Sequence, residues 1–127
     1  MVRSRTRAGA QVQPAKPPES FLPLSPLEFR ILLVLMGGAS HAYRIVKEIE
    51  AREAGETVYP ANLYRRIRDL LELGLIEEVG GVAGEEGGRR RTLLRASELG
   101  RRVAKAEAKR LEALVLDARD VRLLGRA

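Results

Sequence analysis

The chain is 127 residues long, which suits one small domain with appendages and a modest core. It has no cysteine and one histidine, His41, which excludes disulfides, thiolate metal sites and histidine metal clusters. Its net charge is +6, and 19 of its 23 basic residues are arginine, the side chain best shaped for phosphate and guanine. The longest apolar run, Ile31–Met36, is too short to span a membrane, and no apolar signal segment marks the N-terminus. We therefore expect a cytoplasmic protein.

Residues 1–20 have the composition of a disordered arm, with recurrent proline and almost no large apolar side chains. They hold four basic residues and one acid, which account for half of the net charge. The rest of the chain is therefore only mildly basic, and the positions of its arginines are a better indicator of nucleic-acid binding than the total charge. Arg3, Arg5 and Arg7 could contact phosphate or a minor groove, although a solubilising tail would have the same composition.

The first helix is expected over 26–36, where nearly continuous apolar residues indicate the central helix of the core. Ser25 and Glu28 have the spacing of a capping box. Leu24 and Phe29 are placed to form the hydrophobic staple that accompanies such a box.

A second helix is expected over His41–Arg52, with Ser40 as its capping residue. Its core-facing residues recur at helical spacing: Ala42, Ile45, Val46 and Ile49. His41 at the helix start is expected to cap or pack rather than to bind a ligand. Gly55 is expected to end the helix, and 56–59 to connect it to the next one.

The stretch Tyr59–Val79 predicts a helix, a tight stop and a strand. Pro60 suits the first helical turn, where its missing N–H costs nothing. The apolar residues fall on one face of this third helix: Leu63, Ile67, Leu70 and Leu71. Gly74 supplies the left-handed residue that ends it, and 75–79 then reads as a short strand.

The polar face of this third helix is the candidate DNA-reading surface. At 100° per residue, Arg65 lies almost opposite the apolar stripe, with Asn62 beside it. We expect Asn62, Arg65 and Arg66 to contact bases in the major groove, where arginine pairs with guanine and asparagine with adenine. Tyr64 and Arg68 are expected to contact phosphate. An isolated helix of this kind would more often be a solvated surface, but the elements that follow favour DNA binding.

A glycine-rich loop over Gly80–Gly88 separates the short strand from a second extended run, Arg89–Ala96. Two strands joined by such a loop predict a β-hairpin wing. Three helices followed by a hairpin are the order of a winged helix-turn-helix, whose wing lies over the DNA backbone. The wing residues expected to contact phosphate are Arg89, Arg90 and Arg91.

Ser97 is expected to cap a last long helix that runs from Glu98 to about Val121. Its apolar residues form a broken stripe: Leu99, Val103, Ala106, Leu111, Leu114, Ala118 and Val121. Because the three-helix core is complete without them, we expect this stripe to pack on a second copy of the chain. A tail helix folded back on its own chain is the alternative.

Several motifs occur in a fixed order over residues 24–118. They are LSP with ILLVL at 24–35, HAYRIVKEI at 41–49, PANLY at 60–64, LELGLI at 71–76, and RRR through SELGR at 89–101. On these motifs the chain resembles the PadR family of bacterial transcriptional regulators, especially short members with one C-terminal helix. The resemblance implies a dimeric winged-helix repressor that binds an inverted-repeat operator and is often released by a small molecule.

Three positions depart from the pattern of that family. Glycine is usual where Ala42 stands, threonine or serine where Asn62 stands, and paired aromatics where Leu93 and Leu94 stand. Some relatives stack flat aromatic compounds at the dimer interface. This chain has no Trp, and its aromatic residues all precede the expected dimer helix. An effector site of that kind is therefore not expected here.

The sequence thus predicts an α+β winged helix-turn-helix protein in three parts: a basic arm over 1–20, a DNA-binding domain over 21–96 and a dimerisation helix over 97–127. The expected partners are double-stranded DNA, a second copy and a small-molecule effector of unknown identity, with no cofactor or metal. The expected function is transcriptional regulation, by occlusion of a promoter. The alternative is a winged-helix module whose Arg65 and Arg66 pair with an acidic protein. We expect no enzyme, because no acid and base stand at a recognisable spacing.

Overall fold

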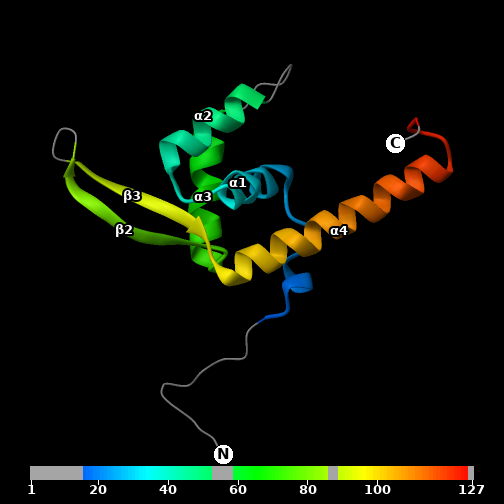
Figure 1. Cartoon of the computed structure of the whole chain (residues 1–127), viewed down its shortest axis with the longest axis horizontal. Coiled ribbons are helices and arrows are strands. Elements are labelled where there is room, and N and C mark those ends of the chain that lie inside the picture. The colour runs from blue at the N-terminus through cyan, green and yellow to red at the C-terminus, as the bar shows by residue number, and fades with distance from the viewer. Residues whose placement is uncertain (1–15, 53–58, 86–88, 126–127) are drawn as a thin grey trace, which may run out of the picture.

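The computed structural model of the chain describes residues 16–52, 59–85 and 89–125, and for 81–91 the backbone alone. The elements in order are the 3-10 helix η1 (Pro18–Phe21), α1 (Pro26–Met36), β1 (Ser40–His41), α2 (Ala42–Arg52), α3 (Pro60–Leu73), β2 (Ile76–Glu85), β3 (Arg89–Ala96) and α4 (Glu98–Asp120). In Figure 1, α1, α2 and α3 lie together, the β2–β3 hairpin reaches out on one side, and α4 leads away on the other. The expected α+β class, with three helices, a hairpin and a long last helix, is confirmed.

The first helix begins as the sequence predicts. The Ser25 hydroxyl accepts a hydrogen bond from the Glu28 N–H at 3.1 Å, and the Glu28 carboxylate accepts one from the Ser25 N–H at 3.0 Å. These two bonds are the expected capping box, and they satisfy backbone donors that the helix itself leaves unpaired. Leu24 is buried and Phe29 packs against the core, as the expected staple requires.

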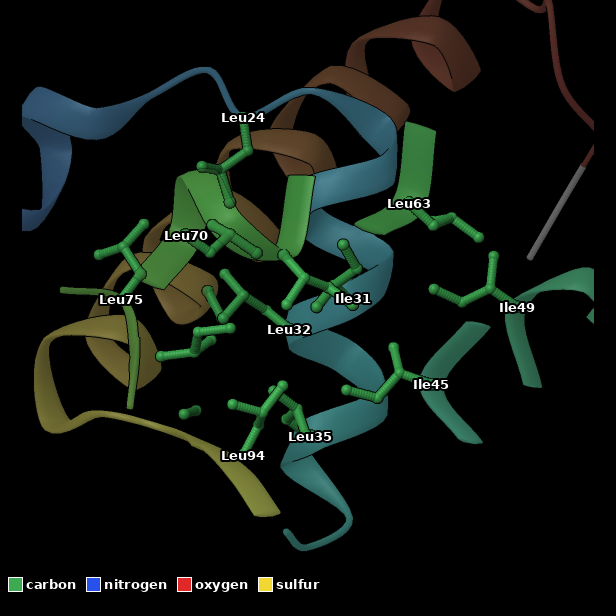
Figure 2. Packing of buried hydrophobic residues seen from close by; sticks show 14 of the residues in the cluster. Leu24, Ile31, Leu32, Leu35, Ile45, Ile49, Leu63, Leu70, Leu75 and Leu94 are labelled. Atoms are coloured by element: carbon green, nitrogen blue, oxygen red, sulfur yellow. The ribbon is translucent and has the colours of Figure 1, made fainter. Parts of the chain in front are cut away.

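The core surrounds α1, as Figure 2 shows. Side chains from every neighbouring element point into one cluster, whose labelled members are Leu24, Ile31, Leu32, Leu35, Ile45, Ile49, Leu63, Leu70, Leu75 and Leu94. The apolar faces predicted for α2 and α3 are therefore buried, and α1 is the central helix of the core as expected.

The start of α2 differs from the prediction. Ser40 and His41 form a two-residue strand that pairs with Leu94 and Leu93, so the helix begins at Ala42 and Ser40 is not its capping residue. The sheet order is β1-β3-β2. His41 Nδ1 lies 3.1 Å from the Thr92 carbonyl oxygen, which places its proton on Nδ1. His41 is thus a packing residue, as expected. A two-residue strand is too short to leave a periodic signal in the sequence.

The third helix ends as predicted. Gly74 adopts a left-handed φ of 79°, and the N–H groups of Gly74 and Leu75 bond back to the carbonyls of Leu71 and Leu70. The strand that follows starts at Ile76 rather than Leu75. The expected end of α2 at Gly55 and the 56–58 connection lie outside the described residues.

The wing differs from the prediction in length. Most of the expected loop over Gly80–Gly88 is strand, because β2 continues to Glu85 and remains paired with β3. The register shifts between Val79 and Val82 and again between Val82 and Glu85. Glycine is a poor strand residue on its own, but irregular pairing tolerates it where a partner strand supplies the hydrogen bonds.

The N-terminus of α4 is joined to the α3–β2 turn. The Ser97 hydroxyl donates to the Gly74 carbonyl at 2.6 Å and accepts from the Gly100 N–H at 3.0 Å, so Ser97 is the expected cap. The Ser97 N–H donates to the Leu75 carbonyl at 3.0 Å. A Cβ on Gly100 would lie 1.9 Å from the Leu75 carbonyl oxygen, so only glycine permits this approach.

The first turns of α4 belong to the core of their own chain. Val103 is 0% exposed and Ala104 is 5% exposed, and Leu99 packs against the same cluster. We expected the three-helix core to be complete without α4. This is wrong, because the N-terminal half of α4 is part of that core. Val103 is unavailable to a second copy.

The boundary expected at residue 20 also moves. Pro18–Phe21 forms η1, which packs against α4, so 18–20 belong to the folded part. Residues 1–15 of the expected arm lie outside the described residues.

Glu107 of α4 is a buried carboxylate, 2% exposed. Its two oxygens accept hydrogen bonds from Nε and Nη2 of Arg110, each at 2.8 Å. The Arg110 hydrogen bonds and charge, with a further bond from the Leu24 backbone N–H, outweigh burial and lower the pKa of Glu107 below 4.5. The ion pair itself lies within α4, and it is the bond from the Leu24 backbone that joins Glu107 to the segment leading into α1.

Gly100→Ala should destabilise the protein by about 1–3 kcal/mol or more, because the added methyl meets backbone that cannot rotate away. Gly80→Ala is the matched control, since a Cβ there meets no atom within 4 Å. Urea unfolding measures both. Equal stability of Gly100→Ala and the parent would contradict the close approach.

Glu107→Gln should lower stability at neutral pH, on the order of 1 kcal/mol, because the charged hydrogen bonds are lost. Since the folded pKa is depressed, the stabilisation by Glu107 is present above pH 4.5 and disappears as the pH falls through the folded pKa. Parent and variant should therefore converge on acidification. Urea unfolding between pH 7 and pH 3 tests this, and parallel stability curves would contradict it.

Candidate nucleic-acid interface

The α3 helix is amphipathic, with its apolar face buried and its arginine-bearing face exposed, as the sequence predicts. Leu63, Ile67 and Leu70 are 0%, 4% and 0% exposed, while Arg65 and Arg68 are exposed and Asn62 is half-buried. We call the surface formed by Asn62, Arg65 and Arg68 the outer face of α3. It lies opposite the residues that anchor the helix on α1.

The two arginines of the outer face have no acidic partner in the described part of the chain. Arg65 Nη2 instead donates a hydrogen bond to the Asn62 side-chain oxygen at 2.8 Å. Five other arginines of the described residues lie within 4 Å of a carboxylate, as Arg52 does with Glu48 and Arg95 with Glu77. The outer face therefore presents positive charge that the protein does not neutralise itself.

Arg66 differs from Arg65. Its guanidinium lies 3.9 Å from the Glu28 carboxylate of α1 and 3.7 Å from that of Asp69. Its side chain is 42% exposed, on the flank of α3 that faces the start of α1. The sequence predicts a groove contact for Arg66, and the structure shows that this charge is shared with two acids.

Exposed tyrosines accompany these helices. Tyr64 of α3 is 40% exposed, as a phosphate contact requires. Tyr43 at the start of α2 is 59% exposed, with the Lys47 ammonium 5.4 Å from its ring centre. Sequence reasoning did not single out Tyr43 or Lys47, although both fall outside the apolar face of α2. The first helix of a helix-turn-helix crosses the DNA backbone, which makes this pair a candidate addition to the site.

The three wing arginines occupy the end of β3 nearest the hairpin turn. Arg89 is the register partner of Glu85, and Arg91 that of Val82. Figure 1 shows this end of the hairpin farthest from α4. Arg95, nearer the base, pairs with Glu77 at 2.7 Å and is thus neutralised. The wing therefore carries its basic residues near its tip.

Residues 16–52, 59–85 and 89–125 offer neither a metal site nor a membrane-spanning helix. No group of three or more His, Asp and Glu side chains in those ranges could hold a metal ion. No helix in them is long and apolar enough to cross a membrane.

No family model and no curated protein sequence matches this chain. Solved structures do match it. A PadR family transcription regulator from Clostridium difficile has a TM-score of 0.64 and 15% identity, and the match covers 76% of this chain and 98% of that one. A transcriptional regulator from Clostridium thermocellum has a TM-score of 0.62 and 23% identity, covering 77% and 90%. A PadR-like transcriptional regulator from Bacillus cereus has a TM-score of 0.64 and 16% identity, covering 79% and 93%.

The chain therefore has a winged helix-turn-helix fold with a long C-terminal helix. More narrowly, its fold is that of PadR-type regulators, and the resemblance drawn from the sequence motifs is confirmed at the level of structure. The roles of individual residues on DNA remain predictions.

Proposed function

We propose that this chain is a transcriptional regulator that binds DNA as a homodimer. The observation that supports this most is the outer face of α3, where Arg65 and Arg68 are exposed without an acidic partner in the described part of the chain. Helices α2 and α3 form the helix-turn-helix, and in that motif the second of the two helices, here α3, enters the major groove. The similar structures from Clostridium difficile and Bacillus cereus are themselves transcription regulators.

On this proposal the residues divide into base and backbone contacts. Arg65 lies at the centre of the outer face and is the residue placed to read guanine. Tyr64 and Arg68 contact phosphate beside it, and Arg66 reaches the groove edge from its place next to Glu28. Arg89, Arg90 and Arg91 contact the backbone from the wing.

The second half of α4 supports the dimer. Large apolar side chains are exposed along it and just beyond it: Leu114, Val115, Leu116, Val121, Leu123 and Leu124. A helix that leaves the domain with so much exposed apolar surface is typical of an interface, although Leu116 lies on the face opposite Leu114 and Val121. Of the expected stripe, we assign Leu111, Leu114, Ala118 and Val121 to contact with a second copy. Leu99 and Ala106 lie nearer their own core.

The proposed mechanism is repression by occupancy. In the dimer, paired α4 helices would hold two winged-helix domains. These would dock on the half-sites of an inverted repeat, about one turn of the DNA helix apart. Ser97 and Gly100 join α4 to the turn at the end of α3, so a change in the angle between the α4 helices would change the separation of the two α3 helices. An effector that favours one separation would thereby change operator affinity. Such a regulator works in the cytoplasm, where the DNA lies.

Arg65→Ala should cost roughly 1–3 kcal/mol of operator affinity and relax base preference at one position in each half-site. Arg101→Ala, which removes an exposed arginine from α4, is the charge-matched control and should keep that preference. Operator sequences come from selection of genomic fragments, and affinities from titration at several salt concentrations. A uniform loss on all DNA would reassign Arg65 to the backbone. An absence of salt dependence would favour a protein-binding module instead.

Leu114→Glu should convert the dimer to a monomer, because the two-fold axis places two carboxylates in one apolar interface. The winged-helix domain keeps its own core, so the helical content of the variant should remain. Operator affinity should fall, because a monomer cannot bind the second half-site at the same time as the first. Leu116→Glu is a matched control: Leu116 is 55% exposed and Leu114 52%, and two residues of helix turn them about 200° apart. Sedimentation velocity should show a monomer for Leu114→Glu and a dimer for Leu116→Glu. The reverse result would place the interface on the other face of α4.

A further inference from the structure

The Arg65 guanidinium is held by a side chain of its own helix. Its Nη2 donates to the Asn62 oxygen at 2.8 Å, across one turn of α3. Arginine has only donors, so the asparagine atom that faces it has to be the amide oxygen. Chemistry alone therefore fixes which way round the Asn62 amide lies.

This contact prepares Arg65 for base reading. A free, exposed arginine samples many rotamers and loses that freedom when it binds. Because Asn62 already restricts the Arg65 side chain in the free protein, less conformational entropy is lost on binding, and affinity rises. The contact uses one of five N–H groups, and the remaining four are enough for a paired contact with guanine O6 and N7.

The same contact takes one of the two lone pairs of the Asn62 oxygen and fixes the direction in which the amide points. To read adenine, an asparagine presents its oxygen and its NH2 group together to N6 and N7 of the base. Here the oxygen already accepts from Arg65. Asn62 is also half-buried whereas Arg65 is exposed, so the arginine is the more accessible member of the pair.

The neutrality of the acceptor matters as well. Arg66 is held by the carboxylates of Glu28 and Asp69, which offset its charge. An amide oxygen holds Arg65 in place and leaves its full charge available to DNA. A carboxylate at position 62 would hold the guanidinium too, but it would add a negative charge beside the phosphates.

We infer that Asn62 is a positioning residue for Arg65, so that the two side chains together read one guanine instead of a guanine and an adenine. This inference rests on the proposed function, and it assigns Asn62 a different role from the expected one of a groove contact in its own right.

A double-mutant cycle tests it with the parent, Asn62→Ala, Arg65→Ala and the double variant. Each full-length protein is titrated with operator and used to select from a library of randomised half-sites. Asn62→Ala should weaken operator binding roughly two- to tenfold, the range for one hydrogen bond, and should relax the same position as Arg65→Ala. In the Arg65→Ala background it should change nothing further. Additive losses, or relaxation at a second position, would overturn the inference.

Asn62→Asp supplies the conservative variant. It keeps the acceptor oxygen and lacks the amide donors, so it should retain the guanine preference while affinity for all DNA falls with the added negative charge. Loss of that preference, as in Asn62→Ala, would show that the amide donors read a base.

Two controls separate the possible failures. Circular dichroism and thermal unfolding should be unchanged in all variants, because both side chains lie on the surface side of α3. A parent that selects no sequence from the library would overturn the proposed function and this inference together. A parent with clear sequence preference but an additive cycle would overturn the inference alone.

Discussion

The contact between α4 and the α3–β2 turn is the constraint on which the rest of the structure depends. Helix α3 ends with Gly74 as its cap, and α4 begins with Ser97 as its cap, whose hydroxyl bonds to the Gly74 carbonyl. Gly100 then lies against the Leu75 carbonyl at a distance that excludes any other residue. One junction thus fixes the end of α3, the first residue of the wing and the direction of α4. The third helix and the long last helix are thus joined directly, by one serine hydroxyl and a close backbone approach.

Charge is distributed so that only part of the arginine content is available to a ligand. Arg52, Arg66, Arg95, Arg102 and Arg110 each lie within 4 Å of a carboxylate. Apart from the pair with the buried Glu107, these are surface pairs, which contribute little stability but lower the local potential. In the part of the chain that the structure describes, Arg65 and Arg68 are outside this pattern, as are the exposed Arg44 and Arg101, but Arg65 and Arg68 lie together on one face of α3. A modest net charge can therefore still give a concentrated positive surface, which the total alone does not reveal.

Local chemistry made much of the fold predictable. The capping box at Ser25, the apolar stripe from Leu63, and the left-handed Gly74 each depend on residues close in sequence, and all three are present. Contacts between distant segments were not predictable. The strand at Ser40 exists only because β3 lies beside it, and Val103 is buried only because α4 crosses the core. For the site, helical periodicity predicted which residues of α3 are exposed, whereas the bond from Arg65 to Asn62 depends on rotamers that a sequence does not specify.

The glycine-rich strand β2 lies at the edge of the sheet, and this position bears on association with other molecules. Because the order is β1-β3-β2, β2 is an edge strand, and the edge of a sheet is where chains associate and aggregate. Flat, apolar edges are the most dangerous ones. This edge has two register shifts, three glycines between 80 and 84, and two glutamates at 77 and 78. It is thus poorly suited to receive a strand from another molecule.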